Sequence, residues 1–163
     1  MKSIPKGALV ADGMFVLERF VPFRLSVLAN RMTRAVALVY ARRFNVSAPE
    51  WRTLAVLGRF GAMTANSVVE RTAMDKVRVS RAVTRLLELG YITRKTDPLD
   101  RRRAILDLTA SGHNVYRQIV PRALAVEREL LQALDRDERA AFESAISKLE
   151  NRIVVAGSAA EEE

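Results

Sequence analysis

Residues 75–90 read DKVRVSRAVTRLLELG, and this stretch decides the fold. On a helix, at ~100° per residue, its apolar side chains fall on one stripe, made of Val79, Ala82, Val83, Leu86 and Leu87. Arg81 falls nearly opposite the centre of that stripe. Asp75 is predicted to cap the helix at its start and Gly90 to end it. We therefore predict a helix that buries one side and turns a polar, basic side to solvent.

The side chains on this polar face suit DNA. An arginine can pair bidentately with a guanine edge, and a valine or threonine methyl group can contact thymine. Serine, lysine and flanking arginine side chains suit phosphate oxygens, which fix register rather than sequence. The candidate DNA contacts on this helix are Lys76, Val77, Arg78, Ser80, Arg81 and Arg85.

The neighbouring segments complete a winged helix-turn-helix over residues 64–109. Residues 64–71 predict a short helix, and residues 72–74 a tight connection to the basic helix. After Gly90 the pattern predicts two strands, 91–96 and 104–109, joined by a turn. A basic hairpin tip in this position can enter the adjacent minor groove or grip its phosphates. The candidate wing contacts are Arg101, Arg102 and Arg103, with Asp100 predicted to orient an arginine through a charge-assisted bond.

The charge distribution points to a polyanionic partner. The net charge is +8, with a pI near 10.6. Residues 1–44 carry eight basic and two acidic side chains, residues 76–103 carry nine and three, and residues 104–163 carry seven and eleven. Basic density this local favours nucleic acid as the partner. A solvated basic face is the alternative interpretation.

Several function classes are left with few candidate residues. There is no cysteine and one histidine, His113, so disulfides, thiolate metal sites and cysteine redox sensing are excluded. No Ser-His-Asp set, metal cluster or glycine-rich phosphate loop is visible, so we expect neither an enzyme nor a cofactor. No apolar run approaches the roughly 20 residues that cross a membrane, and no signal peptide is visible at the N-terminus. A cytoplasmic protein is expected.

The rest of the chain is mostly helical. A long helix is predicted over residues 20–43, with Pro22 in its first turn. Ser47 and Glu50 form a predicted capping box that opens the next helix. Residues 110–155 predict two further helices. The expected organisation is a flexible arm (1–19), an N-terminal helical region (20–46), the DNA-binding domain (47–109), C-terminal helices (110–155) and a disordered tail (156–163).

Residues 75–81, 86–92, 97–102 and 108–112 together resemble the MarR (multiple antibiotic resistance regulator) family. The D-x-x-D-R-R wing followed by L-T-x-x-G is the most specific element, and the resemblance covers roughly residues 20–153. It implies a mainly α, α+β fold, a winged helix with a two-stranded wing, flanked by N- and C-terminal dimerisation helices. It also implies a homodimer on a palindromic operator, with repression the commoner mode. Many relatives carry small polar residues where this chain has Val77 and Arg78, so the operator sequence does not carry over.

Residues 20–31 and 71–76 look like the subgroup that controls aromatic-acid catabolism, some of whose members respond to hydroxycinnamoyl- or benzoyl-type coenzyme A thioesters. This resemblance implies a small aromatic acid or its thioester as effector, bound between the dimerisation helices and the winged helix. The candidate ligand residues are Phe23, Arg24, Asn30, Arg31, Arg34, Phe44 and Trp51. Alternatively, Trp51 belongs to the core, the arginines complement the acidic C-terminal helices of a partner subunit, or Arg34 binds DNA phosphates.

Three other functions stay open from the sequence. The basic totals alone would suit a nonspecific or architectural DNA-binding protein. A regulator of the same family could sense a different molecule, such as a drug or phenolic toxin. A winged helix can also serve as a protein-interaction module without DNA.

Overall fold

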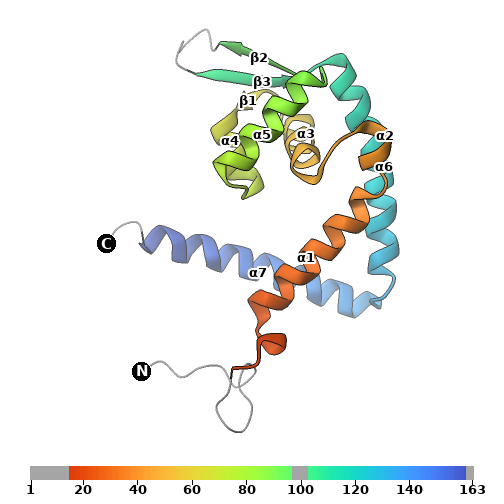
Figure 1. Cartoon of the computed structure of the whole chain (residues 1–163). Coiled ribbons are helices and arrows are strands. Elements are labelled where there is room, and N and C mark those ends of the chain that lie inside the picture. Colours follow the sequence, from red (N-terminus) through yellow and green to blue (C-terminus); the bar gives the residue numbers. More distant parts are fainter. Residues whose placement is uncertain (1–14, 97–102, 161–163) are drawn as a thin grey trace. The chain divides into compact units, whose positions relative to one another are not determined.

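The computed structural model describes residues 15–96 and 103–160, with side chains as far as Ile153. The chain divides into two compact units, residues 1–123 and 124–163, and each is considered by itself. Figure 1 shows the elements, which are η1 (Leu17–Arg19, a 3-10 turn), α1 (Val21–Ala37), α2 (Ala41–Phe44), α3 (Ala48–Phe60), β1 (Met63–Thr64), α4 (Ala65–Thr72), α5 (Lys76–Glu88), β2 (Ile92–Thr96), β3 (Ala104–Leu108), α6 (Ala110–Leu131) and α7 (Arg136–Ala160).

The core of the first unit forms around α5. The apolar stripe predicted from the sequence is buried, with Val79 and Leu86 at 1% and 0% exposure. It packs with Leu54 and Leu57 of α3, Val68 of α4, and the inner face of the sheet. Burying side chains of this size contributes roughly 1.5–3 kcal/mol each. The helix predicted over residues 75–89 is confirmed, because α5 begins after Asp75 and ends before Gly90, whose φ of +68° suits glycine.

The single helix predicted over residues 20–43 is wrong in one respect. α1 ends at Ala37, and a turn at residues 38–40 precedes the four-residue α2. Within this turn the Val39 and Tyr40 N–H groups donate to carbonyls three residues back, at 3.2 Å each. The break turns Tyr40 and Phe44 into the core, at 1% and 8% exposure. A continuous helix would point these two rings elsewhere, so burial of the rings outweighs helix continuity.

The sheet has one strand more than the two-stranded wing predicted. β1 pairs with β3 through Met63↔Leu106, and β3 pairs with β2 through Ile92↔Leu108 to Thr96↔Ala104, giving the antiparallel order β1-β3-β2. The predicted strands correspond to β2 and β3. The tip of the hairpin, with Asp100, Arg101 and Arg102, lies outside the described residues.

The C-terminal helices are longer than predicted at one end. α6 is one helix through Pro121, and α7 continues to Ala160, so the disordered tail predicted from residue 156 is wrong for its first residues. Most of the predicted arm, residues 1–14, lies outside the described residues. None of the helices described is long and apolar enough to span a membrane.

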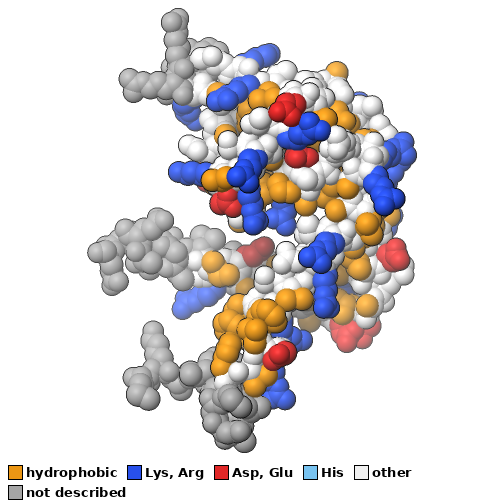
Figure 2. All heavy atoms as spheres, in the orientation of Figure 1, with side chains coloured by type: hydrophobic (Ala, Val, Ile, Leu, Met, Phe, Trp, Pro, Cys, Tyr) orange, Lys and Arg blue, Asp and Glu red, His pale blue; other side chains and the backbone are white. Residues whose placement is uncertain are grey.

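An apolar patch covers η1 and the start of α1. Phe15 and Phe20 meet edge to face, with ring centroids 5.4 Å apart. Figure 2 shows hydrophobic side chains gathered over this end of α1. The exposed members of this α1 patch are Phe15, Leu17, Phe20, Val21, Phe23, Leu25 and Leu28. A monomer rarely leaves a contiguous apolar surface of this kind uncovered.

The L-T-x-x-G segment joins the sheet to α6 through close backbone contacts. The Thr109 N–H donates to the Tyr91 carbonyl at 3.0 Å, and the Thr109 hydroxyl accepts from the Gly112 N–H at 3.0 Å. A Cβ atom on Gly112 would lie 1.9 Å from the Tyr91 carbonyl oxygen. This position therefore requires glycine for close approach of two backbones.

Gly112→Ala is expected to lower the free energy of unfolding by about 3 kcal/mol, at the upper end for overpacking, because the clash is with backbone. Urea unfolding followed by circular dichroism would measure this loss. Ser111→Ala, at the exposed neighbouring position, should stay within ~0.5 kcal/mol of the parent protein. Equal stability of the two variants would contradict the close approach.

Candidate nucleic-acid interface

Two capping residues and a left-handed turn position α5. Thr64 caps α4, its hydroxyl accepting from the Ser67 N–H at 3.2 Å. Ala73 then adopts φ +50°, which turns the chain sharply between α4 and α5. The Asp75 carboxylate accepts from the Arg78 N–H at 2.8 Å. The helix, tight turn and capped second helix match the predicted helix-turn-helix.

The outer face of α5 carries the predicted contact residues. Lys76, Val77, Arg78, Ser80 and Arg81 are exposed, and Arg85 is half-buried. Val77 is 59% exposed. Figure 2 shows Lys and Arg side chains gathered over α4, α5 and the hairpin. The face is therefore basic, with an apolar contact point near its start.

The arginines on this face differ in their partners. Arg78 pairs with Asp75 at 3.2 Å, and Arg85 pairs with Glu88 at 3.0 Å. Both pairs are exposed, so each holds its guanidinium only weakly. No carboxylate among the described residues pairs with Arg81. Arg81 is thus the guanidinium on this helix with its donors available for an external acceptor.

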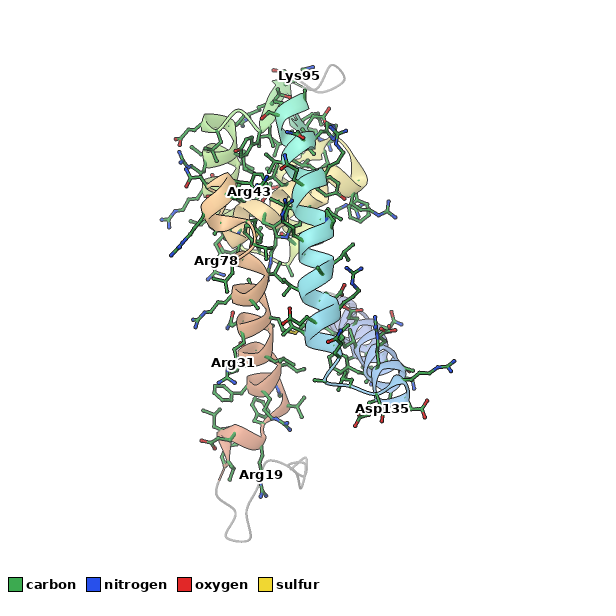
Figure 3. The ribbon with its side chains drawn as sticks, turned by 90° about the vertical axis from the view of Figure 1, so that its right-hand side faces the viewer. Arg19, Arg31, Arg43, Arg78, Lys95 and Asp135 are labelled. Atoms are coloured by element: carbon green, nitrogen blue, oxygen red, sulfur yellow. The ribbon has the colours of Figure 1, made fainter. Side chains whose placement is uncertain are left out.

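The hairpin adds further basic side chains beside α5. Arg103 is exposed at the start of β3, and Arg94 and Lys95 are exposed on β2. Lys95 lies near the outer end of the hairpin in Figure 3. Sequence reasoning missed Arg94, which lies directly opposite Leu106 in the strand register.

A small cavity of about 220 Å³ lies between α1 and α3. Its walls include the rings of Tyr40 and Trp51, whose centroids are 5.7 Å apart, and Trp51 also stacks on Tyr116 at 6.1 Å. Arg52 lines it too and donates to the Thr33 hydroxyl at 3.4 Å. Burial raises the pKa of the Tyr40 phenol, and the positive charge of Arg52 partly opposes this rise. The phenol therefore stays neutral at physiological pH.

The predicted ligand residues do not all meet at this cavity. Trp51 lines it, whereas Phe44 is buried in the core beneath the Arg43 guanidinium. The remaining candidates, Phe23, Arg24, Asn30, Arg31 and Arg34, are exposed on α1, and Figure 3 shows Arg31 on that helix. Arg52 was missed, although the capping box at Ser47 and Glu50 already placed it in the first turns of α3.

Comparison with known proteins gives a consistent result. A model of the MarR family matches residues 44–103. The regulator PecS of Dickeya dadantii is 24% identical over 133 residues, or 80% of each chain. BpsR of Bordetella bronchiseptica has the same fold, with a TM-score of 0.75, 24% identity, and coverage of 85% of this chain and 98% of BpsR. A cysteine-to-serine mutant of E. coli MarR, solved in complex with operator DNA, has a TM-score of 0.73 and 22% sequence identity. The match covers 83% of this chain and 99% of MarR.

The chain is similar to MarR-family proteins over residues 44–103. The matched segment runs from Phe44 in the core to Arg103, the residue before β3. This segment includes the whole of α5 and β2 and ends just before β3. The similarity therefore covers the part of the chain that carries the basic face of α5.

Asp75→Ala is expected to lower the free energy of unfolding by about 1 kcal/mol, because the Arg78 N–H and the first turn of α5 lose their cap. Asp75→Asn is the matched control, since it keeps a side-chain acceptor and removes only the exposed ion pair with Arg78, worth less than ~1 kcal/mol. Urea unfolding curves of both variants measure the difference. A loss as large in the asparagine variant would place the effect in the ion pair rather than the cap.

Proposed function

We propose that this chain is a homodimeric repressor of the MarR family that binds a palindromic operator through α5 and the hairpin and is released by a small aromatic acid. The observation that carries the proposal is the outer face of α5. Four of the five residues of its inner stripe are buried and Leu87 is partly buried, so the exposed arginine and valine side chains point away from the core. A helix presented in this way fits the major groove, about 12 Å wide, and its arginines match guanine edges.

The α1 patch supports the homodimer. Its aromatic and aliphatic side chains are too many and too contiguous for a chain that functions alone. α7 also leaves large apolar side chains exposed, with Ile153 at 70% and Leu149 at 49%. A second copy of the chain covers such surfaces with the same patch, as a two-fold axis requires. The two α5 helices of such a dimer, if about 34 Å apart, would then meet successive major grooves.

Arg81→Ala is expected to weaken operator binding about 10- to 100-fold, because a bidentate guanine contact is worth ~1–3 kcal/mol of discrimination. The operator is first selected from random or genomic DNA, and affinities are then measured by fluorescence anisotropy on operator and scrambled duplexes. The ratio of the two affinities should fall with the operator affinity. Arg117→Ala, which removes an exposed arginine on α6, is the control for net charge and should leave this ratio unchanged.

Two results would contradict this assignment. A ratio of specific to nonspecific affinity near one in the parent protein, at several salt concentrations, would favour an architectural DNA-binding protein. Unchanged DNA binding by a variant lacking Arg81, Arg101 and Arg102 would favour a protein-interaction module.

The cavity beside Trp51 supports an aromatic acid as effector. Tyr40 and Trp51 offer ring faces, Arg52 offers a cation, and Thr33 a hydroxyl. At about 220 Å³ the cavity is smaller than the ~300 Å³ lower limit of typical ligand pockets. A single substituted ring fits this volume, whereas a coenzyme A thioester would leave its nucleotide outside. DNA binding by BpsR, which shares the fold, is regulated by 6-hydroxynicotinic acid, and the same class of ligand suits this cavity.

Arg52→Gln is expected to raise the concentration of benzoic or hydroxynicotinic acid needed for DNA release at least tenfold, because the carboxylate loses its charged partner. Operator affinity without the acid should not change. Arg59→Gln, on the same helix but outside the cavity lining, is the matched control. Equal binding of the acid to free protein and operator complex would rule out release by this route, because coupling is reciprocal. Benzoyl-coenzyme A should act more weakly than the free acid, and the reverse order would favour the thioester.

A further inference from the structure

One carboxylate contacts both the main chain and the side chain of Arg78. Asp75 Oδ1 accepts from the Arg78 N–H at 2.8 Å, and Asp75 Oδ2 forms an ion pair with Arg78 Nε at 3.2 Å. Asp75 is also the N-cap of α5, and Arg78 is the third residue of that helix. The contact therefore ties the arginine side chain to the point where the helix begins. We call these two residues the Asp75–Arg78 pair.

The ion pair leaves the outer end of the Arg78 guanidinium available. It is made through Nε, and no acceptor among residues 15–96 and 103–160 is bonded to either terminal nitrogen of Arg78. An arginine carries its five N–H donors in a rigid planar fork, so a carboxylate beside Nε favours an orientation in which the two terminal nitrogens face elsewhere. The side chain of Arg78 is 71% exposed. The pair thus presents two adjacent donors to solvent.

The other two arginines of α5 are arranged differently. Glu88 contacts Arg85 through the terminal nitrogen Nη1, at 3.0 Å, and Arg85 is half-buried. An acceptor that needed both terminal nitrogens of Arg85 would have to break that ion pair. Arg81 has no carboxylate partner among the described residues to orient its guanidinium. Of the three arginines, Arg78 combines an orienting carboxylate with available terminal donors.

The place of the Asp75–Arg78 pair on α5 favours contact with a base. Residues at the start of a recognition helix are the ones that reach base edges in the major groove. Guanine presents two acceptors there, N7 and O6, which match two adjacent arginine donors. The negative charge of Asp75 offsets the positive charge of Arg78, so the pair adds little to the general attraction for phosphates. The pair is therefore suited to selecting a base rather than to raising affinity for any duplex.

We propose that Arg78 is a specificity-determining residue that reads one guanine in each half-site of the operator, with Asp75 as its positioning residue. The inference rests on the proposed DNA-binding function. It goes further by naming a base that each half-site must contain and by giving the cap of α5 a second role.

The first test compares the sequences that the full-length parent protein and Arg78→Ala select from random DNA. The parent protein should select a guanine at one position of each half-site. Arg78→Ala should lose that preference about 10- to 100-fold, because a bidentate guanine contact is absent. Its slope of log K against log salt should fall by much less than the ~0.9 expected of a phosphate contact. Arg78→Lys should also lose most of the preference, because an ammonium group lacks the planar fork.

A modified base tests the contact at the level of one atom. Replacing the selected guanine with 7-deazaguanine removes the N7 acceptor and leaves O6 in place. The parent protein should bind this duplex about tenfold more weakly, because one bond of the bidentate contact is lost. Arg78→Ala should bind the two duplexes equally.

Asp75→Asn tests the positioning role, because it keeps the capping acceptor and removes the charge. The guanine preference should fall about two- to fivefold, the range of an exposed ion pair. Overall affinity for any duplex should rise, since a negative charge near the phosphates is gone, and a loss of folding would not give these opposite signs. In the Arg78→Ala background, Asp75→Asn should change the preference no further. Glu88→Gln, which removes the carboxylate of the other ion pair on α5, should leave the preference at this position unchanged.

The outcomes separate this inference from the proposed function. If the parent protein prefers an operator but Arg78→Ala keeps every base preference, the inference fails and the regulator assignment stands. A fall in the salt slope of about 0.9 with the preference retained would make Arg78 a phosphate contact. An equal effect of Asp75→Asn in both backgrounds would show that Asp75 does not act through Arg78. If the parent protein selects no sequence at all, the proposed function is overturned together with this inference.

Discussion

The buried stripe of α5 is the constraint on which the other features depend. Val79 and Leu86 are almost fully buried against α3, α4 and the sheet, and this fixes the rotation of the helix about its axis. When the apolar side of a helix is buried in this way, the residues on its opposite side are necessarily the exposed ones. The positions of Arg81 and Val77 therefore follow from the packing of the buried residues on the opposite side of the helix.

The same packing aligns the hairpin, the second element of the candidate DNA interface. Gly90 ends α5 with a positive φ, and the Tyr91 N–H donates to the Leu86 carbonyl at 3.0 Å, so β2 starts directly from the end of the helix. The Tyr91 carbonyl then accepts from Thr109, which returns β3 to the same point. Helix and hairpin are thus tied at one end.

The sequence predicted features that depend on local pattern and missed those that depend on distant contacts. Periodicity and caps gave α5, α4 and the two long strands. β1 has only two residues, too few for a β-strand propensity to be recognised in the sequence. It forms because β3 offers it an unpaired edge. The break after Ala37 is invisible in the α1 pattern, because its cause is the burial of Tyr40 by other elements.

The candidate sites divide in the same way. The contact residues on α5 could be chosen from one helix, and the structure exposes them as expected, with Arg85 half-buried. The ligand residues were chosen by chemical type along α1, but a cavity depends on which helices pack together, and α3 supplies its cation. Arg94 could have been found, because it has the same parity as Ile92 on a strand whose inner face is apolar. A charged residue on the apolar face of a strand is a candidate for a functional contact.

Trp51 connects the cavity to the rest of the first unit. One side of its ring lies near Tyr40 at the cavity, and it also stacks on Tyr116 of α6. The Tyr116 ring in turn occupies the space that a Cβ atom on Gly58 would need, 2.7 Å away, so α6 rests directly on the backbone of α3. Under the proposed function, an occupant that displaced Trp51 would disturb its stacking on Tyr116, the residue through which α6 contacts α3. Such an occupant releases DNA only to the extent that it binds the displaced arrangement more tightly than the original one.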